Sequence, residues 1–338
     1  MLTARDRRRW AERESDALRE GRRARALGLP HRHGTPLLSA EHRYLADATA
    51  RLRSSSVVAY TRTAGYLRSW LESIGVGTTE SVTAENLWGF RAWVVAQGWR
   101  PSTVRNVLAI AKAQLVWWRR GGLVPLLTQD AIQDRLSAPS VVRSAPVAYT
   151  PEQLRGLLSA ALEHGWGSAV LVSLHLLLGL RAAELRLLTW DRVLVDAPPS
   201  GEIRIGADSK THRARVVDLC VSPAARLILR SLPRRAPRVC PWARTAASMR
   251  HRRSMIGGPP GWTWQTLRET AASYLVCAPG IWGSASAYRT ARQLGHSVAV
   301  SERHYMGLLR GIPDTARTLE AAMGIESELA RVVAAIPR

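Results

Sequence analysis

The chain has 338 residues, of which 46% are hydrophobic, so it is long enough for about two globular domains of ordinary composition. It has no run of about 18 uncharged apolar residues, which argues against a membrane span. Its first residues, MLTARDRRRWAERESD, lack the apolar stretch of a secretory signal. The formal charge of +22 predicts a polyanionic partner, with nucleic acid as the first candidate.

Cysteine and lysine usage add two constraints. Cys220, Cys240 and Cys277 are far apart and form no CxxC pair, so we expect apolar filler rather than a disulfide framework or a zinc site. This usage fits a reducing compartment. Nearly every basic residue is arginine, and Lys112 and Lys210 are the only lysines. The base composition of a gene accounts for arginine in place of lysine, but not for the excess of base over acid.

The first part of the chain predicts an arm followed by a helical domain. Residues 1–40 are rich in arginine and predict a basic N-terminal arm. Residues 41–122 predict a small bundle, because three stretches have apolar residues at helical spacing and each ends at glycine. These stretches are SSSVVAYTRTAGYLRSWLESIG, AENLWGFRAWVVAQG after an N-cap at Thr83, and RPSTVRNVLAIAKAQLVWWRRGG. Residues 123–148 lack periodicity and predict an interdomain linker.

Residues 149–338 predict a second, mixed domain with a C-terminal tail. It opens on the capping box Thr150-Pro151-Glu152-Gln153, and an apolar helix follows in SAVLVSLHLLLGL. The stretch EIRIGADSKTHRARVVDL alternates like two strands around a turn, which predicts a hairpin with Lys210 at its tip. Further helices are predicted in SPAARLILRSL and WQTLRETAASYLV, and CAPGIWGSASAYRT is predicted to be a loop. The fold class is therefore mainly α with a small β-hairpin or sheet.

Four separated places in this second domain carry residues suited to chemistry. Taken singly, each has a simpler explanation as a surface charge or a packed aromatic. Their order and spacing make them a candidate set: GLRAAEL with Arg181 and Glu184, the hairpin with Lys210, WQTLRETAASYL with Arg268, and LGHSVAVSERHYMG with His296 and, nine residues later, Tyr305.

This set resembles the tyrosine recombinase family, the phage-integrase type. GLRAAEL nearly matches the family's first arginine box, SKT fits its hairpin-lysine turn, and LGH keeps its distance to the tyrosine. The second box, HxLR in the family, reads Gln265-Thr266-Leu267-Arg268 here, so glutamine replaces the usual histidine. The segment PSTVRNVL at 101–108 resembles part of the family's core-binding domain, and the resemblance covers about residues 41–310.

The resemblance implies an architecture and a set of partners. It implies a helical core-binding (SAM-like) domain and a mixed α/β catalytic domain that form a C-shaped clamp on double-stranded DNA. It also implies a homo-tetramer on two DNA sites, with the segment after Tyr305 as a candidate for docking onto a neighbouring protomer. An accessory DNA-bending protein is a candidate further partner, and neither a cofactor nor a metal is implied. The expected location is the cytoplasm and nucleoid, or the nucleus of a eukaryote, and the expected source is a mobile element or phage.

The resemblance also implies a role for each residue. Tyr305 would attack the phosphorus and form a 3′-phosphotyrosyl ester, which stores the energy of the broken bond. Arg181 and Arg268 would stabilise the non-bridging oxygens, because guanidinium matches phosphate geometry. His296 would donate to a non-bridging oxygen or handle the tyrosine proton, and Lys210 would protonate the departing 5′ oxygen. Glu184 would orient Arg181 or a neighbouring group, and Gln265 could donate a hydrogen bond but carry no charge.

Two alternatives to a site-specific recombinase stay open. A DNA-binding relative that has lost turnover is supported only by Gln265. A nicking-closing enzyme like the type IB topoisomerases would share the chemistry without strand exchange. Strand exchange between two duplexes separates recombinase from topoisomerase, and the absence of covalent adducts identifies the inactive relative.

Overall fold

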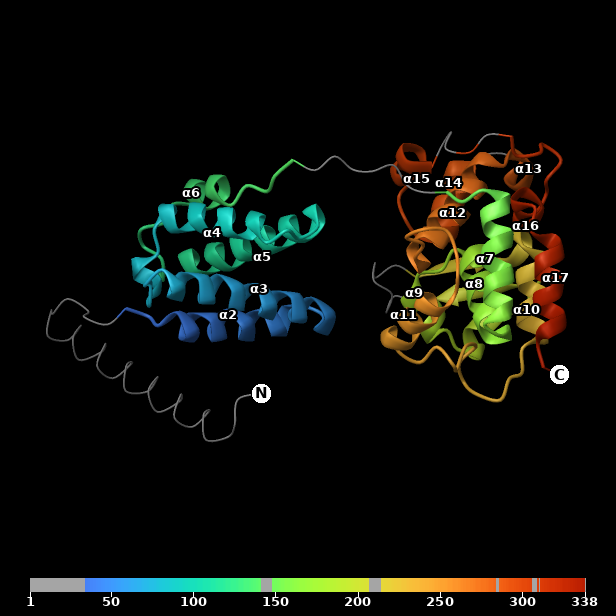
Figure 1. Ribbon diagram of the computed structural model, residues 1–338, viewed down its shortest axis with the longest axis horizontal. Helices are drawn as coiled ribbons and strands as arrows, with labels where there is room; N and C mark the ends of the chain where they lie inside the picture. The colour runs from blue at the N-terminus through green and yellow to red at the C-terminus, as the bar shows by residue number, and fades with distance from the viewer. Residues whose placement is uncertain are drawn as a thin grey trace, which may run out of the picture. The chain divides into compact units, whose positions relative to one another are not determined.

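The computed structural model describes residues 34–140, 148–206, 214–283, 286–305, 309 and 311–337. The chain divides into two compact units between Arg143 and Ser144 (Figure 1). Most of the predicted N-terminal arm, residues 1–33, and the tip of the predicted hairpin, residues 207–213, lie outside the described residues. None of the described helices combines the length and apolar composition that crossing a bilayer requires.

The first unit is a helical bundle around one apolar core. Its helices are α2 (Leu37–Arg51), α3 (Ser54–Ser73), α4 (Ala84–Ala96), α5 (Pro101–Arg120) and α6 (Gln129–Arg135), with a short 3-10 turn at Thr79–Ser81. The predicted N-cap is present, because the Thr83 side chain accepts from the Asn86 amide. Trp118 is fully buried and its indole nitrogen donates to the carbonyl oxygen of Ala40 over 3.1 Å. This hydrogen bond joins α5 to α2 inside the core.

The first unit extends beyond its predicted bounds at both ends. The helix α2 already begins at Leu37, which is buried, whereas the arm was predicted to run to residue 40. The predicted linker at 123–148 is wrong in its first part, because Val124, Leu127, Ile132 and Leu136 belong to the core of the unit. The sequence hides this because α6 has only 7 residues, too few for a periodic apolar pattern.

The second unit packs helices around a small antiparallel sheet and one buried helix. Its elements are α7 (Pro151–Glu163), α8 (Trp166–Leu178), α9 (Ala182–Leu187), β1 (Val193–Leu194), β2 (Glu202–Ile205), β3 (Arg215–Asp218), α10 (Pro223–Ser231), α11 (Ala246–Met255), α12 (Trp264–Cys277), α13 (Pro279–Trp282), α14 (Ser286–Leu294), α15 (Val298–Tyr305), α16 (Leu319–Met323) and α17 (Glu326–Ala335), with 3-10 turns at Trp190–Arg192 and Leu219–Val221. The strand order is β1-β2-β3, and Ile203 of β2 faces Val217 of β3 in register.

The helix α8 forms the centre of the second unit. Every residue from Ser168 to Leu178 is buried, which explains why this stretch is apolar all round rather than on one face. The predicted capping box at the start of α7 is present, with Thr150 and Gln153 bonded to each other's backbone amides. Both α7 and α12 lie against α8. The packing of α12 on α8 is what positions the start of α12 beside the end of α8.

Several predictions for the second unit need correction. The predicted loop at 277–290 contains α13 and the first part of α14, and α14 is an amphipathic helix with Thr290, Ala291 and Leu294 buried. The predicted small hairpin or sheet is confirmed as a sheet, because a third strand, β1, pairs with β2. Cys220 is exposed rather than apolar filler, whereas Cys240 is buried.

The C-terminal helices lie on their own unit. Helix α17 contacts α7, α8 and α10, with α7 and α10 beside it in Figure 1. It buries Leu329, Val332 and Ile336 there. This segment was a candidate for docking onto a neighbouring protomer, but in the monomer its apolar face is already covered.

Candidate active site

The site begins where α8 ends. Gly179 caps α8 in the left-handed conformation, with φ of 58°, and a β-carbon there would collide with the side chain of Leu294. The chain then turns so that Arg181 precedes α9. Glu184, in the first turn of α9, accepts from the backbone amide of Arg181 over 2.9 Å and from its Nη1 over 2.7 Å. The GLRAAEL motif is therefore a helix end, a turn and a helix start.

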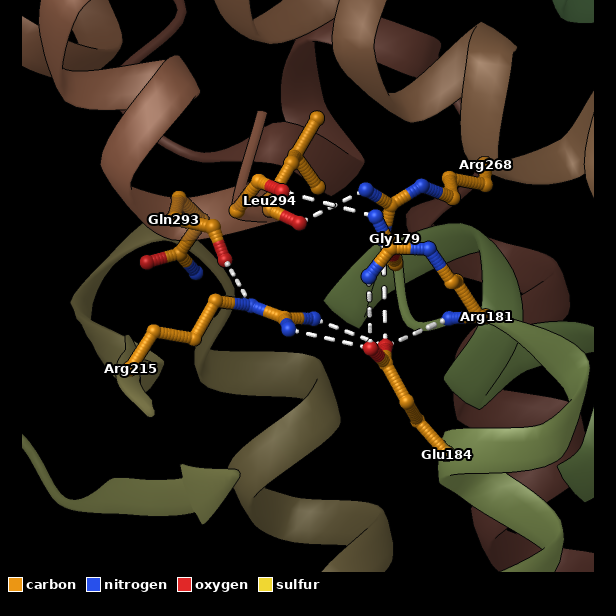
Figure 2. Close-up of polar contacts among 8 residues, drawn as sticks. Gly179, Arg181, Glu184, Arg215, Arg268, Gln293 and Leu294 are labelled. Carbon is orange, nitrogen blue, oxygen red and sulfur yellow. Dashed lines mark hydrogen bonds and ion pairs between the residues drawn. The ribbon is translucent and has the colours of Figure 1, made fainter. Parts of the chain in front are cut away.

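Glu184 also accepts hydrogen bonds from Arg215, a residue that was not among the predicted site residues (Figure 2). Nη1 and Nη2 of Arg215 donate to the two carboxylate oxygens over 3.0 and 2.7 Å. Both side chains are buried, with 6% and 5% of their surfaces exposed. Arg215 is the first residue of β3, and strand alternation places it on the same face as the buried Val217. That alternation was the available signal for an arginine pointing inward.

Arg268 lies early in α12 and is almost fully buried. Its Nη1 donates to the carbonyl oxygen of Gly179 and its Nη2 to that of Leu294, both over 2.6 Å. Nη1 also lies 3.9 Å from a carboxylate oxygen of Glu184. Arg268 therefore joins the end of α8 to the end of α14.

Three arginines meet three consecutive carbonyl groups at the end of α14. The carbonyl oxygen of Gln293 accepts from Nε of Arg215 over 3.1 Å, and that of Leu294 accepts from Arg268. The carbonyl oxygen of Gly295 accepts from Nη2 of Arg181 over 3.4 Å. The last carbonyls of a helix have no partner within the helix and carry partial negative charge. The LGH motif is thus the turn on which the three guanidinium groups converge.

The charges at this site do not balance. Arg181, Arg215 and Arg268 surround the single carboxylate of Glu184. Burial raises the pKa of Glu184, but the hydrogen bonds and charges of Arg215 and Arg181 outweigh it and lower the pKa to about 2. Burial and the neighbouring Arg181 lower the pKa of Arg268 to about 10, so it stays protonated at neutral pH. A buried excess of positive charge of this kind is suited to an anion.

His296 and Tyr305 lie beside one another next to this cluster. Their ring centres are 5.7 Å apart and the rings are inclined by 38°. Nδ1 of His296 lies 3.1 Å from the carbonyl oxygen of Ser297, while Nε2 is buried and has no hydrogen-bond partner in the described part of the chain. Burial lowers the pKa of His296, and the nearby charge of Arg268 lowers it further. Both effects favour the neutral form of the imidazole.

The phenol ring of Tyr305 is buried in a small apolar cluster. It packs with Ala272, Val276 and Leu294, and 9% of the residue is exposed. Burial raises the pKa of Tyr305, as does the charge of Glu269, while the charge of Arg268 lowers it. Its backbone carbonyl accepts from the Cys277 thiol over 3.2 Å. Tyr305 is thus placed at the site but largely covered.

The remaining two predicted site residues, Gln265 and Lys210, are not part of this cluster in the described structure. Gln265 is exposed in the first turn of α12, one turn before Arg268, and its amide donates to the carboxylate of Glu269 over 3.1 Å. Lys210 lies outside the described residues. Of the predicted site residues, the structure gathers Arg181, Glu184, Arg268, His296 and Tyr305 into one place.

A cavity of about 830 Å³ opens beside the cluster. Its walls include His296 and the tip-side ends of β2 and β3, and four arginines line it: Arg192, Arg204, Arg215 and Arg292. In the described residues no group of three or more histidine, cysteine, aspartate or glutamate side chains could hold a metal ion. The available donors here are cationic, which suits a phosphate rather than a cation.

Comparison with solved structures identifies the fold. A lambda integrase fragment, residues 75–356, in a dimer bound to a COC′ core site, superimposes with a TM-score of 0.62 at 17% identity, over 82% of this chain and 98% of that one. A lambda integrase tetramer bound to a Holliday junction gives a TM-score of 0.61 at 16% identity, over 83% and 81%. The XerH site-specific recombinase bound to difH gives 0.57 at 13% identity, over 82% and 95%.

The chain has the fold of the tyrosine recombinases. No protein-family model and no curated protein matches the sequence. The tyrosine recombinase fold is therefore visible here through the ordered motifs and the structure, while sequence identity to these three solved structures is between 13% and 17%.

Within the tyrosine recombinase fold, sequence reasoning missed two parts of the candidate site. One is Arg215, which the hairpin pattern placed on a strand but did not mark as inward-facing. The other is the end of α14, where the carbonyls of its last two residues and of Gly295 accept from the three arginines. The amphipathic spacing of α14 was the signal for this helix.

Proposed function

We propose that this chain is a site-specific DNA recombinase or integrase of the tyrosine recombinase family. The observation that carries the proposal is the buried excess of guanidinium groups beside a histidine–tyrosine pair, on a fold shared with DNA-bound integrases. A phosphodiester is an anion that could occupy such a site, and a tyrosine hydroxyl is a nucleophile that could attack it. This combination supports strand cleavage as well as DNA binding.

In the proposed reaction Tyr305 Oη bonds to the scissile phosphorus and the bond to the 5′ oxygen breaks. Arg181 and Arg268 donate to the non-bridging oxygens, where negative charge increases in the transition state. Lys210 gives a proton to the departing 5′ oxygen. Attack by a 5′ hydroxyl on the 3′-phosphotyrosyl ester reverses these steps and rejoins a strand.

His296 is suited to receive the tyrosine proton. The carbonyl oxygen of Ser297 can only accept a hydrogen bond, so the shared proton belongs to Nδ1 of His296. Nε2 of the neutral ring then carries a lone pair, and it has no hydrogen-bond partner in the part of the chain that the structure describes. This arrangement favours proton transfer from Tyr305 over donation to a phosphate oxygen, the two roles that the resemblance left open.

Cleavage requires the phenol of Tyr305 to be uncovered. Burial raises its pKa, which disfavours the nucleophilic phenolate until the ring leaves its apolar cluster or a positive charge approaches it. We infer that DNA binding supplies this step by drawing the ring out of its apolar cluster toward the scissile phosphate, because a phosphate bound beside Arg268 brings no positive charge of its own to the phenol. The free protein would then hold its nucleophile in a less reactive state.

Double-stranded DNA is the proposed partner, and a homo-tetramer on two sites is the proposed assembly. The charge of +22 supports DNA binding, which should weaken steeply with salt. Solved proteins of the same fold include a dimer bound to a core site and a tetramer bound to a Holliday junction. From the same likeness we also propose that the chain comes from a mobile element or phage. We propose an accessory DNA-bending protein as a further partner.

The test is capture of covalent protein–DNA adducts from cells that express the wild type or Tyr305→Phe. The DNA that flanks the gene and the host genome should both be present, and the attached DNA is sequenced. We expect adducts that need Tyr305 and cluster at one sequence, whereas Tyr60→Phe, which removes a phenol from the first unit, should keep them. Adducts that persist in Tyr305→Phe would move the nucleophile elsewhere.

Two further outcomes distinguish the alternatives. A soluble wild type that binds DNA but never forms adducts would be the inactive DNA-binding relative. A wild type that forms adducts and relaxes supercoiled DNA, but never joins strands of two duplexes that carry the captured site, would be a topoisomerase-like enzyme.

A further inference from the structure

We propose that Arg215 is a positioning residue of this site, acting through Glu184 and through the turn that precedes His296. The inference rests on the proposed function, because it concerns how the phosphate-binding arginines are held. Arg215 engages all three of its nitrogen atoms: Nη1 and Nη2 with the two oxygens of Glu184, and Nε with the carbonyl of Gln293. It is the one described residue that joins the sheet to both α9 and the end of α14 through side-chain hydrogen bonds.

The first part of the role is to hold the carboxylate of Glu184. With Arg215 present, each carboxylate oxygen of Glu184 accepts two hydrogen bonds. Oε1 accepts from the side chains of Arg181 and Arg215, and Oε2 accepts from the Arg181 backbone amide and the Arg215 side chain. Without Arg215, the full negative charge of Glu184 would act on Arg181 and, 3.9 Å away, on Arg268. Those two guanidinium groups would then be less available to a phosphate, because an ionised carboxylate competes for the same donors. Arg215 thus offsets the charge of Glu184 while keeping it in place.

The second part concerns the turn at Gln293–His296. Gly295 has a φ of 72°, and a β-carbon on it would lie 2.7 Å from Cδ of Arg215. The side chain of Arg215 therefore lies directly against this turn as well as bonding to it. His296 follows at once, so a shift of Arg215 would displace the imidazole relative to Tyr305.

The competing role for Arg215 is a direct bond to DNA, since it also lines the arginine-rich cavity. Its burial argues against this, because 6% of its side chain is exposed and its fork already faces Glu184. The two roles predict different losses. A DNA contact would weaken binding, whereas a positioning residue would slow cleavage in the bound complex.

The experiment compares Arg215→Met, Arg215→Lys, Glu184→Gln and the double variant on the captured DNA site. DNA affinity and the single-turnover rate of adduct formation are measured separately. We expect Arg215→Met to slow adduct formation about 100-fold, the cost of a misplaced reacting group, and to leave affinity within about threefold. Arg215→Lys should slow adduct formation less than Arg215→Met does. The double variant should be no slower than Arg215→Met, because that single change already removes both the contact with Glu184 and the contact with the turn.

Arg230→Met is the matched control. Arg230 is half-exposed on α10 and pairs with Asp196, so its loss should alter neither rate nor affinity. An Arg215→Met protein that binds DNA poorly but cleaves normally at saturation would overturn the positioning role in favour of a DNA contact. Losses that multiply in the double variant would overturn the part of the role that acts through Glu184, since Arg215 would then act independently of that carboxylate.

A structural readout separates this inference from the proposed function. Wild-type protein that never forms adducts would refute the proposed function, whatever Arg215 does. A crystal structure of Arg215→Met then tests the positioning alone. Displacement of the Glu184 carboxylate and the 293–296 turn is expected, and their superposition on the wild type would refute the inference.

Discussion

The carbonyl oxygens of Gly179 and Leu294 accept hydrogen bonds from one guanidinium group, that of Arg268. Gly179 ends α8 and Leu294 ends α14, so one buried side chain ties together two helix ends that are distant in the sequence. Each helix end presents carbonyls without helical partners, and Arg268 satisfies one from each. Two of its five N–H groups are used in this way, which leaves donors for a phosphate.

Replacing Arg268 with lysine should therefore abolish most cleavage while keeping charge. A single ammonium group cannot reach both carbonyls and a phosphate in the geometry of the planar fork. We expect Arg268→Lys to lower the rate of adduct formation by about 10²–10³-fold, as does the loss of one transition-state donor in other enzymes. Arg181→Ala should have a loss of similar size. The measurement is the single-turnover rate on the captured site at saturating protein.

The fold must be checked alongside, because Arg268 is buried. Thermal unfolding and DNA affinity of each variant show whether the protein remains assembled. Near-normal cleavage in either folded variant would contradict the assignment of these arginines to the phosphate.

Gln265→His restores the residue type that the related motif usually has. Gln265 is exposed and bonds to Glu269, and a histidine at the same position can keep that hydrogen bond. The carboxylate would also favour its protonated form, adding a charged donor near the site. We expect the rate of adduct formation to stay unchanged or to rise. A sharp loss would mean that this end of α12 serves a different purpose, and Gln265→Ala then tells whether the amide itself is needed.

The parts of the site that the sequence revealed are those with local motifs. GLRAAEL, the QTLR segment and LGH each contain their informative residues within one turn or one helix start, so residue type and spacing suffice. The capping box at Thr150 is similarly local, and the structure has it. The glycine of LGH, Gly295, is also part of such a local motif, but its close contact with Arg215 cannot be predicted from the motif.

What the sequence concealed depends on tertiary packing. Arg215 looks like an ordinary strand arginine until β3 is placed against α14, and only the fold supplies Glu184 as its partner. Ile132 and Leu136 likewise lie in too short a segment to show a period, yet the first unit buries both. The covering of Tyr305 by Ala272 and Val276 also arises from helices that are separate in the chain.

Lys210→Ala should be rescued by DNA with a better leaving group. The proposed task of Lys210 is to protonate the 5′ oxygen, and a bridging phosphorothiolate leaves as a thiolate that needs no proton. We expect Lys210→Ala to cleave ordinary DNA slowly and the sulfur-substituted DNA at nearly the wild-type rate. Arg181→Ala provides the comparison, since its defect lies at the non-bridging oxygens and should not be rescued. Failure to rescue Lys210→Ala would remove its role as the general acid.

Glu184 should contribute to stability in a way that depends on pH. Its pKa falls from an ordinary 4.5 to about 2 on folding, so its contribution is present above about pH 4.5 and is lost as the pH falls toward 2. The difference between these two pKa values corresponds to about 3 kcal/mol of unfolding free energy. The gap in unfolding free energy between wild type and Glu184→Gln should therefore shrink by about this amount across that window.

Denaturant unfolding followed at a series of pH values measures this gap. Glu326→Gln, which removes an exposed carboxylate at the start of α17, is the control, and its gap from the wild type should change less over the same range than that of Glu184→Gln, because water screens an exposed charge. A gap for Glu184→Gln that stays constant from about pH 5 to about pH 2 would contradict the strong pairing with Arg215 and Arg181.

Two glycines with nearly the same backbone conformation provide the last prediction. Gly295 has a φ of 72° and Gly261 a φ of 73°, but a β-carbon on Gly261 would meet no heavy atom within 4 Å, whereas on Gly295 it would meet Arg215. Gly261→Ala should lose only about 1–2 kcal/mol of stability from the left-handed conformation and should keep cleavage. Gly295→Ala should lose more stability and slow adduct formation as well, because Arg215 and the turn before His296 must move apart. Equal losses of stability in the two variants, with cleavage intact in both, would show that the close packing of Arg215 on Gly295 is not needed to hold the site.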